Sequence, residues 1–154
     1  MKSSVYKCIL FLTSILALTG CATYNAQKVG PTAIEHAKTE IPEEQLLDVG
    51  ILVFETKELT PEVAEKEGTN ANIRNAEIQF IPYHLKNTSH QSSHWGAIQV
   101  VPAETNSVDL LVKGKILESN GEHLVIEIDV VDATQKRWFK KVYSAEASET
   151  FYSG

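Results

Sequence analysis

The sequence predicts an α+β (α/β) domain with a mixed, mainly antiparallel sheet of about five strands and helices packed on one face. Three observations support this class. An almost continuous apolar run of strand length occupies 46–54, a helical pattern follows at 71–89, and apolar segments separated by short turns fill 108–143. A strand, a helical region and then a run of strands that can pair with one another predict this arrangement.

The first predicted strand runs from Leu46 to Phe54 and reads LLDVGILVF. Because nearly every position is apolar, we expect a central strand that is covered on both faces. The following Thr60-Pro61-Glu62 supplies an N-cap, a proline at the first helical position and an acid that the helix dipole favours, and Gly68 provides a stop. These residues predict a first helix at 60–68.

A second helical pattern runs from Ala71 to about Ser89. One apolar face comprises Ile73, Ala76, Phe80 and Tyr83 or His84, and Ile78, Ile81 and Leu85 widen it. We expect this face to pack on the sheet. Pro82 lies inside the pattern, where it removes a backbone hydrogen bond and clashes with the preceding turn. The segment is therefore predicted either to kink or to form two abutting helices.

The next strand, 96–102, ends at Pro102, and strands 108–118 and 122–131 form a hairpin around Ser119-Asn120-Gly121. A two-residue Asn-Gly turn would place Lys113 and Lys115 on the most apolar face, whereas a three-residue turn with left-handed Gly121 avoids this. We therefore predict the three-residue turn. It pairs Leu124 with Ile116, Ile126 with Gly114, Ile128 with Val112 and Val130 with Leu110, and it sets Glu127 opposite Lys113 on the solvent side.

The last predicted strand, 136–143, follows the turn formed by 132–135. Both of its faces carry a lysine, so the pattern leaves its register open. Lysines are typical of edge strands, where they discourage pairing with other molecules. We expect this strand at an edge of the sheet.

The start of the chain is typical of a signal peptide, residues 1–20. Lys2 and Lys7 flank the beginning of an apolar stretch from Cys8 to Leu18, which is shorter than the ~20 residues that a membrane-spanning helix needs. The stretch ends in Leu18-Thr19-Gly20-Cys21, which resembles the lipobox of bacterial lipoproteins.

This resemblance implies that signal peptidase recognises Leu18, Thr19 and Gly20, and that Cys21 becomes the first mature residue and carries acyl chains. The next residue is Ala22 rather than the Asp that retains such lipoproteins at the inner membrane. An outer-membrane, periplasm-facing location in a Gram-negative bacterium is the resulting expectation. The alternative is an ordinary secreted protein that is cleaved nearby, with Cys21 as a free thiol.

Residues 21–45 are interpreted as the acylated N-terminus and a flexible tether, and 46–154 as a single domain. Thr32-x-x-Glu35 is a capping box that predicts a short helix within the tether. Removal of residues 1–20 leaves 134 residues with 12 Lys and Arg and 20 Asp and Glu, a net charge of −8. This charge argues against nucleic acid and anionic lipid surfaces as main partners. Cys8 is discarded and Cys21 acylated, so no disulfide is expected.

Three segments together resemble the TolB amino-terminal domain and the CsgG-like curli-secretion lipoproteins: VGILVFE (49–55), VDLLVKGKILE (108–118) and LVIEIDVVDATQKRWFKKVY (124–143). Asp109, Gly114, Asp132 and Trp138 stand at the positions that those families favour. The resemblance implies a non-enzymatic module that docks envelope proteins, sometimes as a ring of identical copies.

This chain departs from the family pattern at two places. Gln135 stands where the families usually have a turn glycine, so a looser turn is expected. The helix that normally follows the last strand is absent. This absence leaves either a minimal domain or a truncated chain.

Few residues suggest chemistry. His84, His90 and His94 cluster, and His90-x-x-x-His94 has the spacing of metal ligands on a helix. Neighbouring serines predict a loop there, and no nearby acid or cysteine completes a ligand set, so we expect no metal site. Glu127 and Asp129 are interpreted as surface charges that pair with lysines. We expect no catalytic residues and no cofactor.

Aromatic residues are the better candidates for function. Trp95 is expected in the core, whereas Trp138, with Phe139 and Tyr143, is a candidate for partner contact on an edge strand that can accept an added strand. The sequence thus favours an outer-membrane lipoprotein that docks envelope proteins, with homo-oligomerisation possible. The alternative is a small-ligand-binding or transporter-auxiliary lipoprotein, which needs an apolar pocket between the helical region and the sheet. A metal-dependent hydrolase is a third hypothesis.

Overall fold

The computed structural model describes residues 25–56, 62 and 69–146. The signal peptide, Cys21 with its lipobox, and the helix predicted at 60–68 lie outside these residues, apart from Glu62. Their predictions therefore remain predictions.

The sheet has seven strands in the order β1-β7-β6-β5-β2-β4, with β3 beside β5. The strands are β1 (Gln27–Lys28), β2 (Val49–Leu52), β3 (Glu55–Thr56), β4 (Ile98–Val101), β5 (Leu110–Ser119), β6 (His123–Asp132) and β7 (Arg137–Glu146). β2 is parallel to β4 and β5, whereas β5, β6 and β7 form an antiparallel meander. The prediction of a mixed sheet is confirmed. The prediction of about five strands is wrong, because two-residue strands such as β1 and β3 are too short to show any periodicity.

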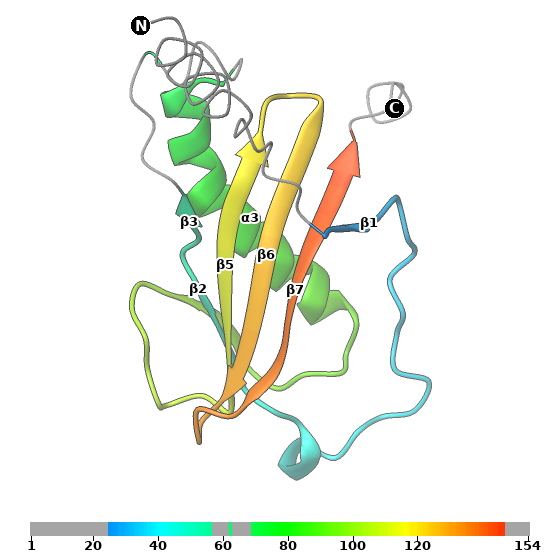
Figure 1. Ribbon diagram of the computed structural model, residues 1–154. Helices are drawn as coiled ribbons and strands as arrows, with labels where there is room; N and C mark the ends of the chain where they lie inside the picture. Colours follow the sequence, from blue (N-terminus) through cyan, green and yellow to red (C-terminus); the bar gives the residue numbers. More distant parts are fainter. Residues whose placement is uncertain (1–24, 57–61, 63–68, 147–154) are drawn as a thin grey trace, which may run out of the picture.

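Helix α3 (Ala71–Gln91) crosses one face of the sheet and lies behind it in Figure 1. Its N-cap is Asn70, whose side chain accepts a hydrogen bond from the backbone N–H of Asn72 at 2.8 Å. Helix geometry continues through Pro82, so the expectation of two abutting helices is wrong. The fold is α+β, with α3 on one face of the mixed sheet.

The face of α3 that packs on the sheet is only part of the predicted one. Ile78, Ile81 and Leu85 pack against the core. Pro82 is fully buried, whereas Ile73 and Phe80, which were expected to face the sheet, are 59% and 67% exposed. The Phe80 ring stacks on His84 at a centroid distance of 5.8 Å. Apolar residues lie on two sides of this helix, so periodicity alone could not select the buried side.

The core covers both faces of β2, as predicted. Val49 and Ile51 lie in the main cluster between the sheet and α3. Leu52 packs on the opposite face against a smaller cluster. That smaller cluster consists of Val108, Leu111 and Val131, with Val101 also packed on it.

The β5–β6 hairpin keeps the predicted faces but not the predicted partners. Ile126 pairs with Ile116 and Ile128 with Gly114, two residues away from the expected register. Next to the turn Ser119 pairs with Leu124, three residues from the expected register, and a bulge between Ile116 and Glu118 reduces the shift to two. Gly121 has a φ of 89°, which confirms the left-handed turn residue. From Leu110 to Ile116 the shift of two leaves each side chain on its predicted face, because the side-chain period of a strand is two.

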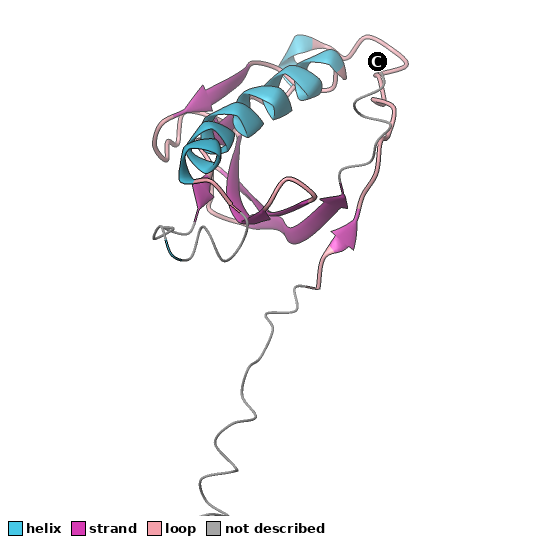
Figure 2. Cartoon of the chain, turned by 90° about the horizontal axis from the view of Figure 1, so that it is seen from above, coloured by secondary structure: helices cyan, strands magenta, loops and turns pink. Residues whose placement is uncertain are grey.

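The segment before β2 lies along the domain. No helix forms at 32–41, and the described segment contains only the 3-10 turn η1 (Glu43–Gln45). The predicted helix at 32–41 is too short to offset its nucleation cost without further packing. Instead, the backbone N–H of Ala37 donates to the carbonyl of Ser92 at 2.9 Å, which fixes the segment to the end of α3. Figure 2 shows this chain passing from β1 around the side of the sheet towards the helix.

β1 lies on the outer side of β7 and runs parallel to it. Gln27 pairs with Tyr143 and Lys28 with Ser144. Lys28 also forms an ion pair with Glu146 at 2.8 Å, which lowers the pKa of that carboxyl. Among the described residues, no strand pairs with the outer side of β7 before Tyr143. The predicted edge position therefore holds for the first part of β7 only.

Candidate functional site

An apolar cavity of about 180 Å³ lies between α3 and the sheet. Side chains from every layer of the fold line it: Val49, Ile51, Leu85, Ser89, Trp95, Leu110, Val112, Ile128, Val130, Trp138 and Phe139. Ser89 is the one described lining residue that is neither aliphatic nor aromatic. Trp95 packs against the core, as the sequence predicted, and forms part of the wall.

A bulge in β7 brings Trp138 and Phe139 to the same cavity. Consecutive residues of a regular strand point to opposite faces of the sheet. Here Val130 pairs with Phe139 and Val131 with Arg137, so Trp138 has no partner in the β6–β7 register. The extra residue turns the Trp138 side chain to the side of Phe139, and both line the cavity. Trp138 is 51% and Phe139 38% exposed, so together they form its outer rim.

Asp132 holds the Trp138 indole in place. The indole Nε1 donates to Asp132 Oδ2 at 3.2 Å. The other carboxylate oxygen accepts from the Thr134 hydroxyl at 2.6 Å and from the backbone N–H of Lys136 at 3.1 Å. These hydrogen bonds lower the pKa of Asp132, with the Thr134 hydroxyl as the largest contributor. One carboxylate therefore fixes both the turn and the tryptophan.

The turn between β6 and β7 is closed rather than loose. Gln135 takes the left-handed conformation, with a φ of 65°, that a glycine would adopt without strain. Its backbone N–H donates to the Asp132 carbonyl at 2.9 Å. The expectation of a looser turn is wrong, because the carboxylate of Asp132 supplies the closure.

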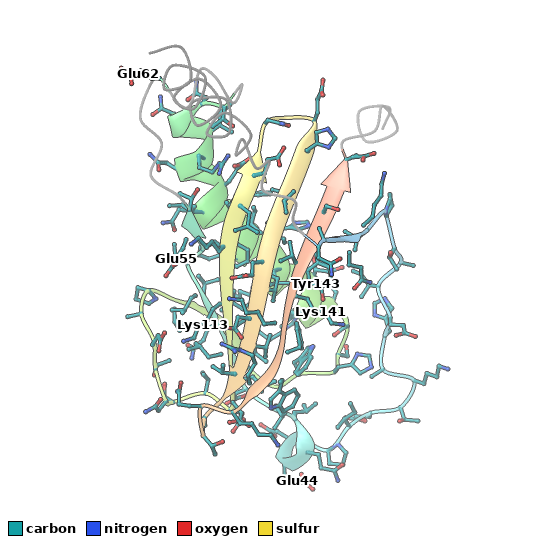
Figure 3. The ribbon with its side chains drawn as sticks, viewed as in Figure 1. Glu44, Glu55, Glu62, Lys113, Lys141 and Tyr143 are labelled. Atoms are coloured by element: carbon teal, nitrogen blue, oxygen red, sulfur yellow. The ribbon has the colours of Figure 1, made fainter. Side chains whose placement is uncertain are left out.

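Lys141 and Tyr143 continue the helix-side face of β7 beyond Phe139. Lys141 pairs with Ile128, which lines the cavity, and Tyr143 pairs with Ile126. The Lys141 ammonium lies over the Phe139 ring, 5.9 Å from its centroid. Tyr143 packs against the core cluster, so it is the least available of the three predicted partner-contact residues. Figure 3 labels Lys141 and Tyr143 on this strand.

The opposite face of the sheet carries paired charges. The Arg137 guanidinium donates two hydrogen bonds, of 2.7 and 2.9 Å, to the Asp129 carboxylate, and this contact raises the pKa of the guanidinium. Lys140 pairs with Glu127 at 2.9 Å. Glu127 lies opposite Lys115 rather than the predicted Lys113, because of the register shift. Both carboxylates are thus engaged in surface ion pairs.

Asp109 and Gly114, two of the residues that carry the family resemblance, contribute to the fold. The backbone N–H of Asp48 donates to the Asp109 carboxylate at 2.8 Å, where β2 begins. A Cβ atom on Gly114 would lie 2.2 Å from the ring of Phe54, so the glycine leaves room for that ring. Asp132 closes the turn before β7. Three of the four residues that carry the family resemblance therefore stabilise the fold.

The histidine cluster lies at the end of α3. His90 is in the last turn and His94 beyond it, separated by Ser93 with a φ of 58°. Within the part of the chain that the structure describes, no three His, Cys, Asp or Glu side chains are grouped so as to hold a metal ion. No described helix has both the length and the apolar character needed to cross a membrane.

Comparison with known proteins yields distant structural likenesses. No protein-family model and no curated protein matches the chain. A point variant of PelC from Paraburkholderia phytofirmans, a dodecamer, is 8% identical with a TM-score of 0.42, over 72% of this chain and 78% of that one. The hypothetical protein CT253 from Chlamydia trachomatis is 13% identical with a TM-score of 0.37, over 68% and 77%. Neither likeness assigns this chain to a family.

Sequence reasoning found the rim of the cavity but missed the cavity itself. Trp138 and Phe139 stand out in the sequence as aromatic residues on a strand with no periodic pattern. The wall could not be recognised, because Val49, Val112 and Val130 look like any other core residues. Two lysines on opposite faces of β7 were visible, and only the structure shows that Lys141 is the one beside the cavity.

Proposed function

We propose that this protein is a non-enzymatic outer-membrane lipoprotein, anchored by acylated Cys21, that docks an envelope protein on the helix-side face of β7. One observation carries the proposal: Trp138 and Phe139 are exposed beside an apolar cavity, on a strand whose outer edge is unpaired before Tyr143 among the described residues. Exposed tryptophan beside a pocket is typical of residues that dominate interface energies. A free strand edge adds backbone hydrogen bonds to such a contact.

The position of β1 indicates that the docking surface on β7 lies close to the membrane when Cys21 is acylated. Gln27 is hydrogen-bonded into the sheet and lies only six residues after Cys21. An extended chain covers at most ~3.6 Å per residue, so the anchor and the sheet are within about 20 Å of each other. A partner in or on the same membrane can therefore reach β7.

The test compares four proteins in detergent-solubilised envelopes: the acylated protein, a Cys21→Ser form, Trp138→Ala and Tyr83→Ala. Tyr83 is a matched control because it is 52% exposed, like Trp138, but lies on the outward side of α3. We expect one partner to co-purify with the acylated protein and the Tyr83→Ala variant. Trp138→Ala removes a side chain that docking would bury, and it should weaken binding of the partner by at least ~30-fold, the equivalent of about 2 kcal/mol.

Two results would contradict the proposal. Mass spectrometry could find an unmodified Cys21 in the native protein, which would remove the anchor. Alternatively, Tyr83→Ala could lose the partner while Trp138→Ala keeps it, which would move the docking surface to the helix.

A second candidate function is the binding of a small ligand, and the cavity is the observation that favours it. Its volume of about 180 Å³ lies below the ~300–1,000 Å³ of usual ligand pockets. It could hold only one ring or a short chain. A transporter-auxiliary role would follow if such a ligand were delivered to a membrane protein.

A further inference from the structure

The ammonium of Lys141 lies close to the apolar cavity, over the ring of Phe139, although Lys141 does not itself line the cavity. Val130 and Phe139 are a cross-strand pair that both line the cavity. Two pairs further along the strands, Lys141 lies opposite Ile128, which also lines the cavity. Paired residues in a sheet project to the same side, so the Lys141 side chain is on the cavity side.

The charge of Lys141 is available to a ligand. Within residues 25–56, 62 and 69–146, no carboxylate forms an ion pair with it. Its neighbour Lys140 projects to the other face and is neutralised by Glu127. The Lys141 ammonium instead lies over the ring of Phe139, which holds it next to the rim.

The size of the hole limits what can enter. An apolar cavity of ~150 Å³ in another protein stays free of water and binds benzene. The cavity here has about 180 Å³ and almost entirely apolar walls, so it suits one ring or a chain of a few methylenes. A longer chain would have to extend past Trp138 and Phe139 into solvent.

The rim is held in shape before any ligand arrives. The β7 bulge turns Trp138 towards the cavity, and Asp132 fixes the indole by a hydrogen bond of 3.2 Å. Bulges that redirect a side chain are frequent beside binding sites. A rim that is already ordered reduces the entropy lost on binding.

We propose that this site binds a fatty acid of short to medium chain length, with the alkyl tail in the cavity and the carboxylate on the Lys141 ammonium. The site deepens the second candidate function, the binding of a small ligand, and does not depend on the docking function. A neutral alcohol would fill the same cavity without the ion pair. An alkylamine would meet the lysine as a like charge.

The chain contains two tryptophans, Trp95 and Trp138, and both line the cavity. Their fluorescence therefore reports occupancy directly. The experiment titrates the full chain carrying Cys21→Ser, without detergent, with butanoate, hexanoate, octanoate, octanol and octylamine below their micellar concentrations. We expect saturable changes, with Kd falling about fourfold per added methylene until the cavity is full.

Separate variants test the contact of the ligand carboxylate and the contact of its alkyl tail. Lys141→Met should weaken octanoate binding by about threefold to tenfold and leave octanol unchanged. Lys140→Met, on the opposite face, should change neither. Val112→Phe should abolish binding of both ligands by filling the cavity, and Leu110→Phe replaces it if that variant fails to fold.

The proposal is overturned if fluorescence does not saturate, if Lys140→Met weakens octanoate as much as Lys141→Met, or if N-acetyl-phenylalanine binds more tightly than octanoate. The last result would assign the site to the terminus of a protein. These titrations contain no envelope protein, so their failure leaves the docking proposal standing, and failure of the pull-down leaves the fatty-acid site standing.

Discussion

The backbone N–H of Phe54 donates to the carbonyl of Ile78 at 3.1 Å, joining the sheet to the middle of α3. In an uninterrupted helix, this carbonyl would accept from the N–H four residues later. That residue is Pro82, which has no N–H, so the carbonyl is free to bind the sheet. The ring of Pro82 is itself fully buried. Pro82 therefore helps to fix α3 to the sheet instead of ending the helix.

Replacing Pro82 with alanine should fail to give the usual stabilisation. In an exposed helix interior, alanine is favoured over proline by ~3 kcal/mol. Here Pro82→Ala removes buried methylenes, each contributing about 0.8 kcal/mol, and the new N–H at position 82 competes with Phe54 for the Ile78 carbonyl. We expect the free energy of unfolding in urea to change by less than about 1 kcal/mol.

The exposed helical residue Asn87 provides the control. Asn87→Ala should raise the free energy of unfolding by a few tenths of a kcal/mol through helix propensity alone. A gain approaching 3 kcal/mol for Pro82→Ala would show that the Phe54–Ile78 hydrogen bond and the buried ring contribute nothing.

The same proline shows how far the sequence could predict this region. The existence of the helix followed from its pattern. Its buried face did not, because Ile73 and Phe80 on one side compete with Ile78 and Ile81 on the other. The decisive contacts are the burial of Pro82 and its effect on a carbonyl, and both require the sheet to be in place.

The strands likewise divide into those that the sequence predicts and those that it does not. The long strands β5 and β6 were predictable, because each has ten residues and an apolar face that must be buried. The strands β1 and β3 have two residues each and depend on neighbours distant in sequence. The candidate site combines both kinds: its aromatic rim was visible in the sequence, whereas its walls were indistinguishable from core.

Gly114→Ala should destabilise the domain by overpacking. The added Cβ would lie 2.2 Å from the Phe54 ring, which is 2% exposed and cannot move aside freely. We expect a loss of about 1–3 kcal/mol in urea unfolding. Gly30→Ala is the control, because nothing lies within 4 Å of its added Cβ. Combining Gly114→Ala with Phe54→Leu should recover part of the loss, and strict additivity of the two would contradict the contact.

Gln135→Gly should stabilise the domain. A left-handed conformation costs an L-residue roughly 1–2 kcal/mol, and glycine gives back about 0.5–1 kcal/mol of this in unfolded-chain entropy. We therefore expect a gain of up to about 1 kcal/mol in thermal or urea unfolding. Lys136→Gly, in the same turn but without a positive φ, should reduce stability. Equal effects of the two glycines would mean that Gln135 is not strained.

Asp132 should make the cavity rim sensitive to acid. Its pKa is lowered in the folded protein, chiefly by the Thr134 hydroxyl, so its ionised form is bound more strongly there than in the unfolded chain. The stability it adds is therefore present above the unfolded pKa, near 3.8, and is lost as the pH falls through the folded pKa. Within that window the hydrogen bond from the Trp138 indole weakens because its acceptor loses its charge, and NMR should show the indole N–H signal shifting with the carboxyl titration. Asp132→Asn should remove this titration and broaden the signal at neutral pH, whereas Asp129→Asn, on the opposite face, should leave it unchanged. A Trp138 signal that is insensitive to Asp132→Asn would mean that the indole is held by packing alone.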